Sequence, residues 1–373
     1  IVEFAGIGPG PFCGMMLADH GAEVIRIDRA SGGRGGSQPI SNKDVLARGR
    51  KSIALNLKSE EGIALARKLC ASADGLIEGF RPGVMERLGL GPEVLLADNP
   101  KLVYGRMTGW GQTGPYAPHA GHDINYIALA GALAHFGRAG EKPTPPINMV
   151  GDFGGGGMML AFGMVSALLN VARGGKGQVI DAAMTDGTAV LMAMIHGMAN
   201  QGIWREDLGA NLLDTGAHFY DTYETADGKF VSIGSIEPQF YAELRARLGL
   251  AEDLEFDVQM NPAQWPALKE KLAAIFKTKT RAEWDALLEH SDVCYAPVLT
   301  MSEAREHPHM AARETFIDVA DGPQPAPAPR YSGTATATPS PAPMPGDDSD
   351  AILSALGLAE ADIAALREAG AVS

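Results

Sequence analysis

The stretch IVEFAGIGPGPFCGMMLADHGAEVIRID, residues 1–28, decides the fold of this chain. Its first five residues form an apolar run typical of a buried strand, and the glycines and prolines of residues 6–11 predict a turn. Residues 12–20 predict a helix that ends at Gly21, and residues 23–28 predict a second strand. A strand, a helix and a strand in this order indicate a βαβ unit, the opening of a doubly wound α/β sheet.

The same alternation continues along the first half of the chain. Helices are predicted over residues 59–72, 83–88, 123–133, 155–173 and 186–200. Strands are predicted over residues 75–78, 102–107 and 178–184. Repeated crossovers of this kind predict a large Rossmann-like domain, in which helices cover both faces of a parallel sheet.

The character of the sequence changes near residue 219. Two strand-like runs, residues 219–225 and 230–233, flank an Asp227-Gly228 turn and indicate a hairpin. Helices follow over residues 238–248 and 265–276, and eight of the 24 prolines then fall within residues 323–345, which favours an extended segment. The predicted parts are a large α/β domain over 1–200, a linker over 201–218, a small α+β domain over 219–310, a Pro-rich return linker over 311–346 and C-terminal helices over 347–373 that pack on the large domain.

Composition limits the class of protein. At 373 residues the chain is long enough for two domains, and its formal net charge of −14 argues against a nucleic-acid partner or an anionic membrane. Cys13, Cys70 and Cys294 lack the spacing of a metal site or a disulfide framework, which favours a reducing, cytoplasmic compartment. We expect the apolar, Gly-rich residues 153–169 to form a core helix rather than a membrane span. The chain begins at Ile1 inside a strand, so we expect a truncated N-terminus, and targeting from that end stays open.

Two short segments carry the side chains best suited to proton transfer. His122 lies in GHDINY, residues 121–126, and Asp152 lies in VGDFG, residues 150–154, each where an irregular segment becomes a helix. Helix openings leave backbone N–H groups free and carry partial positive charge, so two of them can stabilise an oxyanion between a base and an acid. Alone, His122 would be interpreted as a core histidine and Asp152 as a helix cap. The glycines of residues 154–157, however, leave room beside Asp152 for another backbone or a ligand.

Other candidate sites are weaker. The G-x-G turn that includes Gly8 lacks the third glycine of a dinucleotide fingerprint, because Pro11 stands there, so a turn without a nucleotide is favoured over NAD binding. The patterns around Asp186 and Glu237 favour ordinary structural roles. The polar residues 31–51 form either a solvated loop or a positively charged binding site for phosphates. The basic residues that could take part are Arg29, Arg34, Lys43, Arg48, Arg50 and Lys51, with Arg81 and Arg87 after the strand 75–78 placed to reach a pyrophosphate.

Several motifs together resemble the family III CoA-transferases over essentially the whole chain. They are VEFAG at 2–6, EGFRPGVMERLG at 78–89, TGWGQTGP at 108–115, GKGQVID at 175–181 and the closing helix around residues 357–366. Most transferases of that family have a tyrosine where this chain has His122. The intact GHDINY segment, ANLLD at 210–214 and GSIEPQFY at 234–241 are similar to the racemase branch of the family.

This resemblance implies a fold, a reaction and a set of site residues. It implies an interlocked homodimer in which His122 and Asp152 are the acid/base pair, Glu237 of the partner subunit supports His122, and the Asp123 backbone N–H faces a thioester oxygen. The implied reaction is racemisation or epimerisation at the α-carbon of 2-methyl-branched acyl-CoA, by two-base 1,1-proton transfer through an enolate. CoA is then part of the substrate, and no metal or separate cofactor is expected. The residues implied to contact CoA are Arg29, Leu55, Asn56, Leu57, Lys58, Gly79, Phe80, Arg81, Arg87, Gly121, Asp123, Ile124, Asn125 and Tyr126.

The alternative is a CoA-transferase in which Asp152 is the nucleophile of a mixed anhydride. Two departures from the racemase pattern bear on the substrate. The loop after Arg29 is longer and richer in glycine, and Thr215 and His218 stand near the acyl end where the racemases carry glycine and proline. The length of the acyl chain therefore stays open.

Overall fold

The computed structural model describes residues 1–30 and 41–373. The prediction that Arg34 takes part in binding phosphate therefore lies outside the described residues. The chain divides into two compact units. The large unit contains residues 1–130, 147–192 and 312–373, and the small unit contains residues 131–146 and 193–311. The chain therefore enters the small unit twice, whereas the sequence predicted that all of residues 1–200 belong to the large domain.

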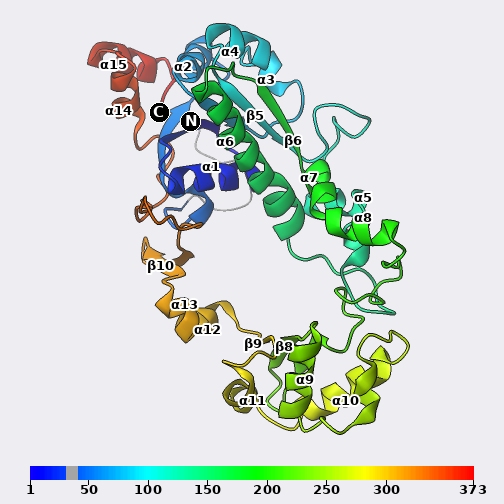
Figure 1. Cartoon of the computed structure of the whole chain (residues 1–373). Coiled ribbons are helices and arrows are strands. Elements are labelled where there is room, and N and C mark those ends of the chain that lie inside the picture. Colours follow the sequence, from blue (N-terminus) through cyan, green and yellow to red (C-terminus); the bar gives the residue numbers. More distant parts are fainter. Residues whose placement is uncertain (31–40) are drawn as a thin grey trace. The chain divides into compact units, whose positions relative to one another are not determined.

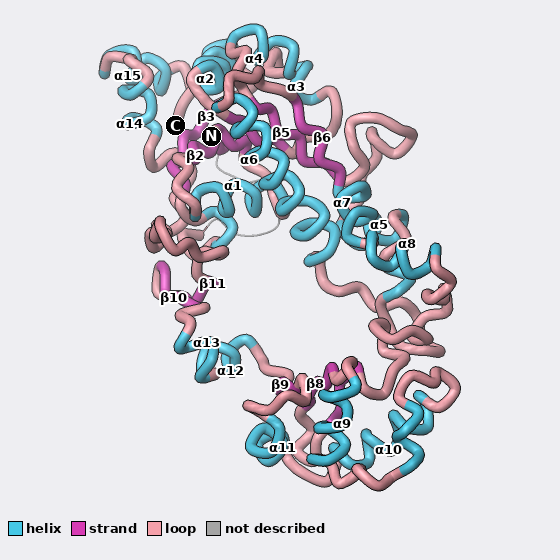
Figure 2. The backbone as a smooth tube through the Cα atoms, viewed as in Figure 1, coloured by secondary structure: helices cyan, strands magenta, loops and turns pink. Residues whose placement is uncertain are grey.

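Among the described residues of the large unit, six parallel strands form one sheet in the order β3-β2-β1-β4-β5-β6 (Figures 1 and 2). The order reverses between β1 and β4, the point at which ligands bind beyond the carboxyl ends of the strands in open α/β sheets. The predicted mixed α/β fold with a large parallel sheet is thus confirmed. The strands are β1 Val2–Phe4, β2 Val24–Arg29, β3 Arg50–Leu55, β4 Gly75–Glu78, β5 Val103–Thr108 and β6 Val179–Ala183.

Helices cover both faces of this sheet because successive strand residues point to opposite sides. Leu76 packs with the cluster that contains Leu69 and Leu95, whereas its neighbour Ile77 packs with the cluster that contains Leu17 and Met164. Two apolar cores, one on each face, therefore hold the sheet. The helices of the large unit outside the site are α1 Pro9–Asp19, η1 Val45–Ala47, α2 Glu60–Ala71, α3 Val84–Arg87, α4 Pro92–Asp98, α6 Met159–Ala172, α14 Ser349–Ala355 and α15 Glu360–Glu368.

The strand β3 corrects one interpretation of the polar stretch before residue 51. Arg48 and Arg50 are 1% and 4% exposed and form buried ion pairs with Asp19 and Glu3. These two arginines are therefore unable to meet a phosphate at the surface. Lys51 is exposed but pairs with Glu23. The sequence pattern missed β3 because a strand covered on both faces shows no alternation, and its Arg50 finds a carboxylate partner, Glu3, on β1.

The helix predicted from residue 155 begins earlier, as the π-helix η3 Met149–Met158, and continues as α6. Asn148 is its N-cap, so Asp152 lies in the first turn and is not the cap. The glycine run leaves room for another backbone, that of α7 Met184–Leu191: a Cβ on Gly187 would lie 1.8 Å from the Gly155 oxygen. Together η3 and α6, residues 149–172, are the one helix in the described structure long and apolar enough to cross a membrane, with 39% of its apolar window buried.

The small unit contains an antiparallel sheet of β7 Tyr220–Glu224, β8 Phe230–Gly234 and β9 Tyr295–Pro297. The predicted hairpin is confirmed, with Gly228 at a φ of 71° in the turn between β7 and β8. Aromatic side chains fill its core, among them Phe219, Phe276 and Trp284. Its helices are η2 Leu133–His135, α8 Ala193–Asn200, α9 Pro238–Arg247, η4 Leu254–Val258, α10 Trp265–Phe276, α11 Arg281–Leu288 and α12 Met301–Glu306.

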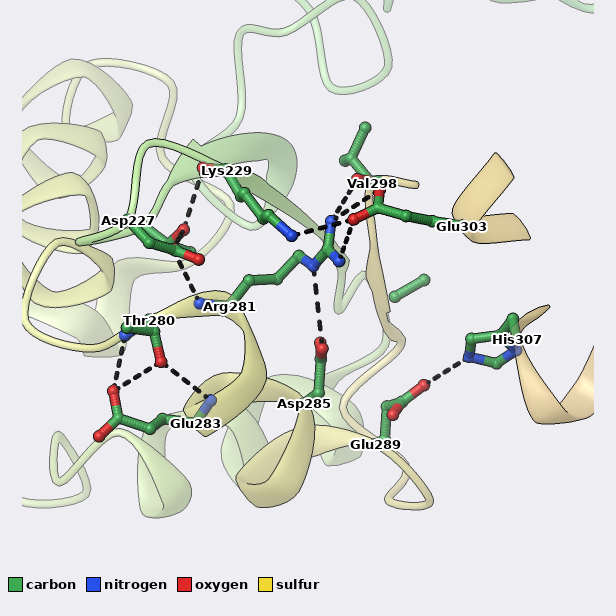
Figure 3. Close-up of polar contacts among 12 residues, drawn as sticks. Asp227, Lys229, Thr280, Arg281, Glu283, Asp285, Glu289, Val298, Glu303 and His307 are labelled. Atoms are coloured by element: carbon green, nitrogen blue, oxygen red, sulfur yellow. Dashed lines mark hydrogen bonds and ion pairs between the residues drawn. The ribbon is translucent and has the colours of Figure 1, made fainter. Parts of the chain in front are cut away.

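A network of charged side chains fastens α12 to the rest of the small unit (Figure 3). Arg281 at the start of α11 donates to both oxygens of Glu303 on α12, and Lys229 beside β8 donates to the same carboxylate at 2.9 Å. The chain then passes through α13 Pro308–Ala312 and the hairpin of β10 Phe316–Val319 and β11 Gly322–Pro325. The predicted return linker therefore contains its own short sheet.

Candidate active site

A cavity of about 940 Å³ opens where the strand order reverses. Its wall contains segments at the carboxyl ends of three strands: residues 5–11, which include the start of α1, residues 79–82 after β4, and residues 108–110, which begin at the last residue of β5. His122, Asn148 and Asp152 also line the cavity. All of these residues belong to the large unit, so the parallel sheet itself builds the site.

His122 is the N-cap residue of α5 Asp123–Leu129 and has extended backbone angles, φ −133° and ψ 171°. Its backbone N–H donates to Asn125 Oδ1 at 3.0 Å, which fixes the opening of the helix. Its side chain is exposed and lines the cavity, so His122 is not the core histidine that it would be interpreted as in isolation.

The residue before His122 admits no side chain. A Cβ on Gly121 would lie 2.7 Å from the Tyr126 ring and 2.8 Å from the Trp110 ring. The Tyr126 hydroxyl donates to the Gly121 carbonyl, and its ring meets Trp110 edge-on at 4.7 Å. Burial raises the pKa of Tyr126 to about 12, so this hydroxyl remains a neutral donor. The two aromatic rings therefore hold the segment that presents His122.

Three contacts fix Asp152: one hydrogen bond to its carboxyl, one from its backbone N–H, and the close approach of Gly8. Asn148 Nδ2 donates to Asp152 Oδ2 at 2.9 Å, and the Asp152 backbone N–H donates to Asp123 Oδ1 at 2.7 Å. Gly8, at a φ of 68°, approaches so closely that a Cβ there would lie 3.3 Å from Asp152 Oδ2. The G-x-G turn that resembled part of a nucleotide fingerprint therefore packs against the carboxyl of Asp152.

The pKa of Asp152 is raised, mainly because burial disfavours its charged form. The Asn148 hydrogen bond opposes this shift, the Asp123 charge adds to it, and the His122 charge lowers it again. A carboxyl with a raised pKa exchanges protons closer to neutral pH. His122 and Asp152 both line this cavity, His122 as the N-cap of α5 and Asp152 in the first turn of η3.

A buried charge network fixes the turn after β4. Glu78 Oε2 accepts from the Phe80 backbone N–H at 2.7 Å, and Arg106 joins Glu78 to Glu86 at 3.0 and 2.8 Å. Burial raises the pKa of Glu78 to about 7, against the opposing effects of the Phe80 hydrogen bond and Arg106. Arg81, which follows this turn, lines the cavity with Arg29 and Lys43 and gives it positive charge.

The structure gathers some of the predicted CoA contacts and leaves others outside the wall of this cavity. Those in the wall are Arg29, Gly79, Phe80, Arg81, Gly121 and Tyr126. Those outside it are Leu55, Asn56, Leu57, Lys58, Arg87, Asp123, Ile124 and Asn125. Leu55 is a core residue, and Asn56 binds the carbonyl of Gly370. Glu237 is the exposed N-cap residue of α9 in the small unit, and its support of His122 stays a prediction.

Sequence reasoning missed Asn148 and the contact between Gly8 and Asp152. A signal for Asn148 existed, because it precedes Asp152 by four residues, the spacing that places two side chains on one face of a helix. The Gly8 contact had no local signal, since it depends on η3 packing against α1.

The model of CoA-transferase family III matches residues 1–349, and this chain belongs to that family. Two of its relatives are racemases. The alpha-methylacyl-CoA racemase of Mus musculus is 51% identical over 324 residues, which cover 87% of this chain and 82% of that protein. The alpha-methylacyl-CoA racemase of Homo sapiens is 48% identical over 332 residues, covering 87% of this chain and 84% of that protein. The crystal structure of a CAIB/BAIF family protein from Brucella suis matches with a TM-score of 0.83 at 29% identity, covering 95% of this chain and 97% of that one.

Proposed function

We propose that this chain is an isomerase, an alpha-methylacyl-CoA racemase, which inverts the carbon next to the thioester carbonyl of 2-methyl-branched acyl-CoA. The observation that carries the proposal is that His122 and Asp152 line one cavity, each at a helix opening. The sequence is 51% and 48% identical to two mammalian racemases, which supports the same reaction.

In the proposed mechanism one of the two residues removes the α-proton. The electron pair of the broken C–H bond forms the C=C bond of an enolate, and the carbonyl oxygen takes the negative charge. In this mechanism the Asp123 backbone N–H, in the first turn of α5 directly after His122, stabilises the oxyanion. The other residue then gives its proton to the opposite face. His122 and Asp152 end with exchanged protonation states, which the reverse turnover or exchange with water restores. Each positioned acid or base contributes about 10²–10⁴-fold to the rate.

The cavity also suits the CoA part of the substrate. Arg29, Lys43 and Arg81 bring positive charge to its wall in a chain whose net charge is −14. Guanidinium and ammonium groups bind phosphate oxygens through charge-assisted hydrogen bonds. CoA is thus recognised as part of the substrate, and the proposed reaction uses neither a metal nor a separate cofactor.

We further propose that two chains form an interlocked homodimer in a reducing, cytoplasmic compartment. Large apolar side chains on α6 are exposed in the single chain, with Phe162 at 73% and Val165 at 55%, and Val190 on α7 is exposed as well. An apolar face of this kind favours a protein partner. In the dimer, Glu237 of the partner subunit would support His122. Cys13, Cys70 and Cys294 are free thiols, as a reducing compartment favours.

Incubating the protein with a single epimer of a 2-methylacyl-CoA in D₂O tests the reaction. A racemase incorporates α-deuterium and forms the other epimer with no acceptor acid present. Transfer of CoA to a free carboxylate without α-exchange would contradict the proposal and would make Asp152 the nucleophile of a CoA-transferase.

The assembly is tested by mixing His122→Ala chains with Glu237→Ala chains. Each variant alone should be inactive, whereas a hybrid dimer contains one site with both native residues. An equal mixture should therefore regain about one quarter of the parent activity. A fully active monomer in sedimentation would rule out a shared site.

A further inference from the structure

The Asp123 carboxylate connects the two turns that carry the proton-transferring residues. Asp123 is the first residue of α5, directly after His122, and its side chain points inward, with the residue only 5% exposed. Its Oδ1 accepts the backbone N–H of Asp152 at 2.7 Å. A single hydrogen bond therefore joins the neighbour of one proton carrier to the backbone of the other.

The facing segment is shaped to admit this carboxylate. A Cβ on Gly151 would lie 2.5 Å from Asp123 Oδ1 and 3.1 Å from the Ile127 side chain. Real Cβ contacts are essentially never that short, so a larger residue at 151 would push η3 and α5 apart. Glycine at this position therefore permits the close approach of the two helix openings.

The second carboxylate oxygen of Asp123, unlike the first, accepts no hydrogen bond from the described residues. This oxygen, Oδ2, is buried. An unpartnered buried oxygen costs stability, so stability alone does not explain the carboxylate. Its charge acts on Asp152, whose pKa it raises, and the other charged group that acts on this pKa is His122.

We propose that the Asp123 carboxylate is a positioning residue that sets the separation between the turns carrying His122 and Asp152. This inference rests on the racemase function proposed above. Inversion requires both residues to reach the α-carbon from opposite faces, whereas exchange on one face requires one residue only. A change in the separation of the turns should therefore slow inversion more than it slows exchange.

Two variants of Asp123 test the proposal, and both keep the backbone N–H at residue 123. Asp123→Ala removes the acceptor, so inversion should fall about 10²-fold with a much smaller change in KM, and the ratio of inversion to α-deuterium exchange should fall. Asp123→Asn keeps an oxygen that can accept the Asp152 N–H, so the ratio should return close to that of the parent. Because Asp123→Asn removes a like charge, the acid limb of the pH–rate profile should move to lower pH.

Two further variants complete the experiment. Gly151→Ala widens the same gap from the other side and should lower the ratio as Asp123→Ala does. Asp348→Ala is the matched control: the Asp348 carboxylate, at the N-cap of α14, accepts the Ser52 N–H at 2.8 Å in the same unit, and neither residue lines the cavity. This control should lose stability without changing the ratio.

Measurements on the parent protein separate the proposed racemase function from the proposed positioning role of Asp123. If the parent neither exchanges nor inverts the substrate, the proposed function fails. If the parent does both, a parent-like ratio in Asp123→Ala overturns the positioning role. A ratio that Asp123→Asn does not restore, or one that falls equally in Asp348→Ala, also overturns it.

Discussion

The two units of the chain use charge in different ways. Around the cavity of the large unit, ion pairs are buried: the Arg106 side chain is 8% exposed and Glu78 is fully buried. Arg106 also reaches the Glu86 side chain, which is 45% exposed. In the small unit, the Arg281 side chain is 11% exposed, and no carboxylate described in its network is fully buried: the Glu303 and Lys229 side chains are 29% and 48% exposed. The first arrangement fixes backbone turns, because Glu78 binds the Phe80 N–H, while the second fastens one helix to its unit.

This difference shows where ion pairs fix the position of backbone turns rather than stabilise the fold. Removing two charges from water costs several kcal/mol for each ion, so a buried pair is weak evidence of stabilisation. The large unit nonetheless buries such pairs directly behind turns that line the cavity: Arg50 donates to the carbonyl of Pro11, and Glu78 supports the turn at Phe80. Variants of each region should therefore differ in the size of their effects and in their response to salt and pH.

The largest effect is expected in the cavity itself. Asp152→Asn and His122→Ala should each reduce interconversion of the epimers by at least about 10³-fold, because each removes one of two proton carriers. Each variant should still exchange the α-proton of one epimer, and the two variants should prefer opposite epimers. Following deuterium incorporation and configuration together measures this. Interconversion at near the parent rate in either variant would remove that residue from the mechanism.

The next largest effect is expected on stability, at the buried ion pair of Arg106 and Glu78. Arg106→Ala should cost about 3–5 kcal/mol in the free energy of unfolding, because it leaves Glu78 buried without its partner. The double variant Glu78→Gln with Arg106→Met should lose less than Arg106→Ala, since no buried charge is then left unpaired. Urea denaturation of the three proteins measures both values. Equal losses in the single and double variants would show that packing, not the unpaired charge, sets the cost.

The pH dependence of stability tests the same region by another route. The pKa of Glu78 in the folded chain is raised from 4.5 to about 7, so the stability that it contributes is present below pH 4.5 and is lost as the pH rises through 7. A shift of this size corresponds to roughly 3 kcal/mol. The free energy of unfolding of Glu78→Gln, relative to that of the parent, should therefore increase as the pH rises from 5 to 8. A difference between the two proteins that stays constant over this range would contradict the raised pKa.

The smallest effect is expected in the small unit. Arg281→Ala should cost at most about 1 kcal/mol, because its partners Glu303 and Asp285 stay partly in contact with solvent, with side chains 29% and 23% exposed. Salt should remove most of this difference, since the Debye length falls to about 3 Å at 1 M. The loss in Arg106→Ala should resist salt. An Arg281→Ala cost as large as that of Arg106→Ala, and unaffected by salt, would erase the contrast between the two units.

Local patterns predicted much of this architecture. The order of strands and helices, the hairpin around Gly228 and the positions of His122 and Asp152 near helix openings follow from periodicity and turn chemistry. The prediction failed at β3 and at the start of η3. In both places burial or packing against distant elements replaces the alternation that a single segment would show.

The sequence by itself determined that this chain forms a parallel α/β sheet and that a histidine and an aspartate stand at two of its helix openings. Only the tertiary structure decided that these two residues share a cavity, that Gly8 and Asn148 hold Asp152, and that Asp123 binds the Asp152 backbone. The reason is physical. Periodicity reports which face of one segment is buried, whereas contacts between distant residues depend on which strands become neighbours and how closely glycine lets backbones approach.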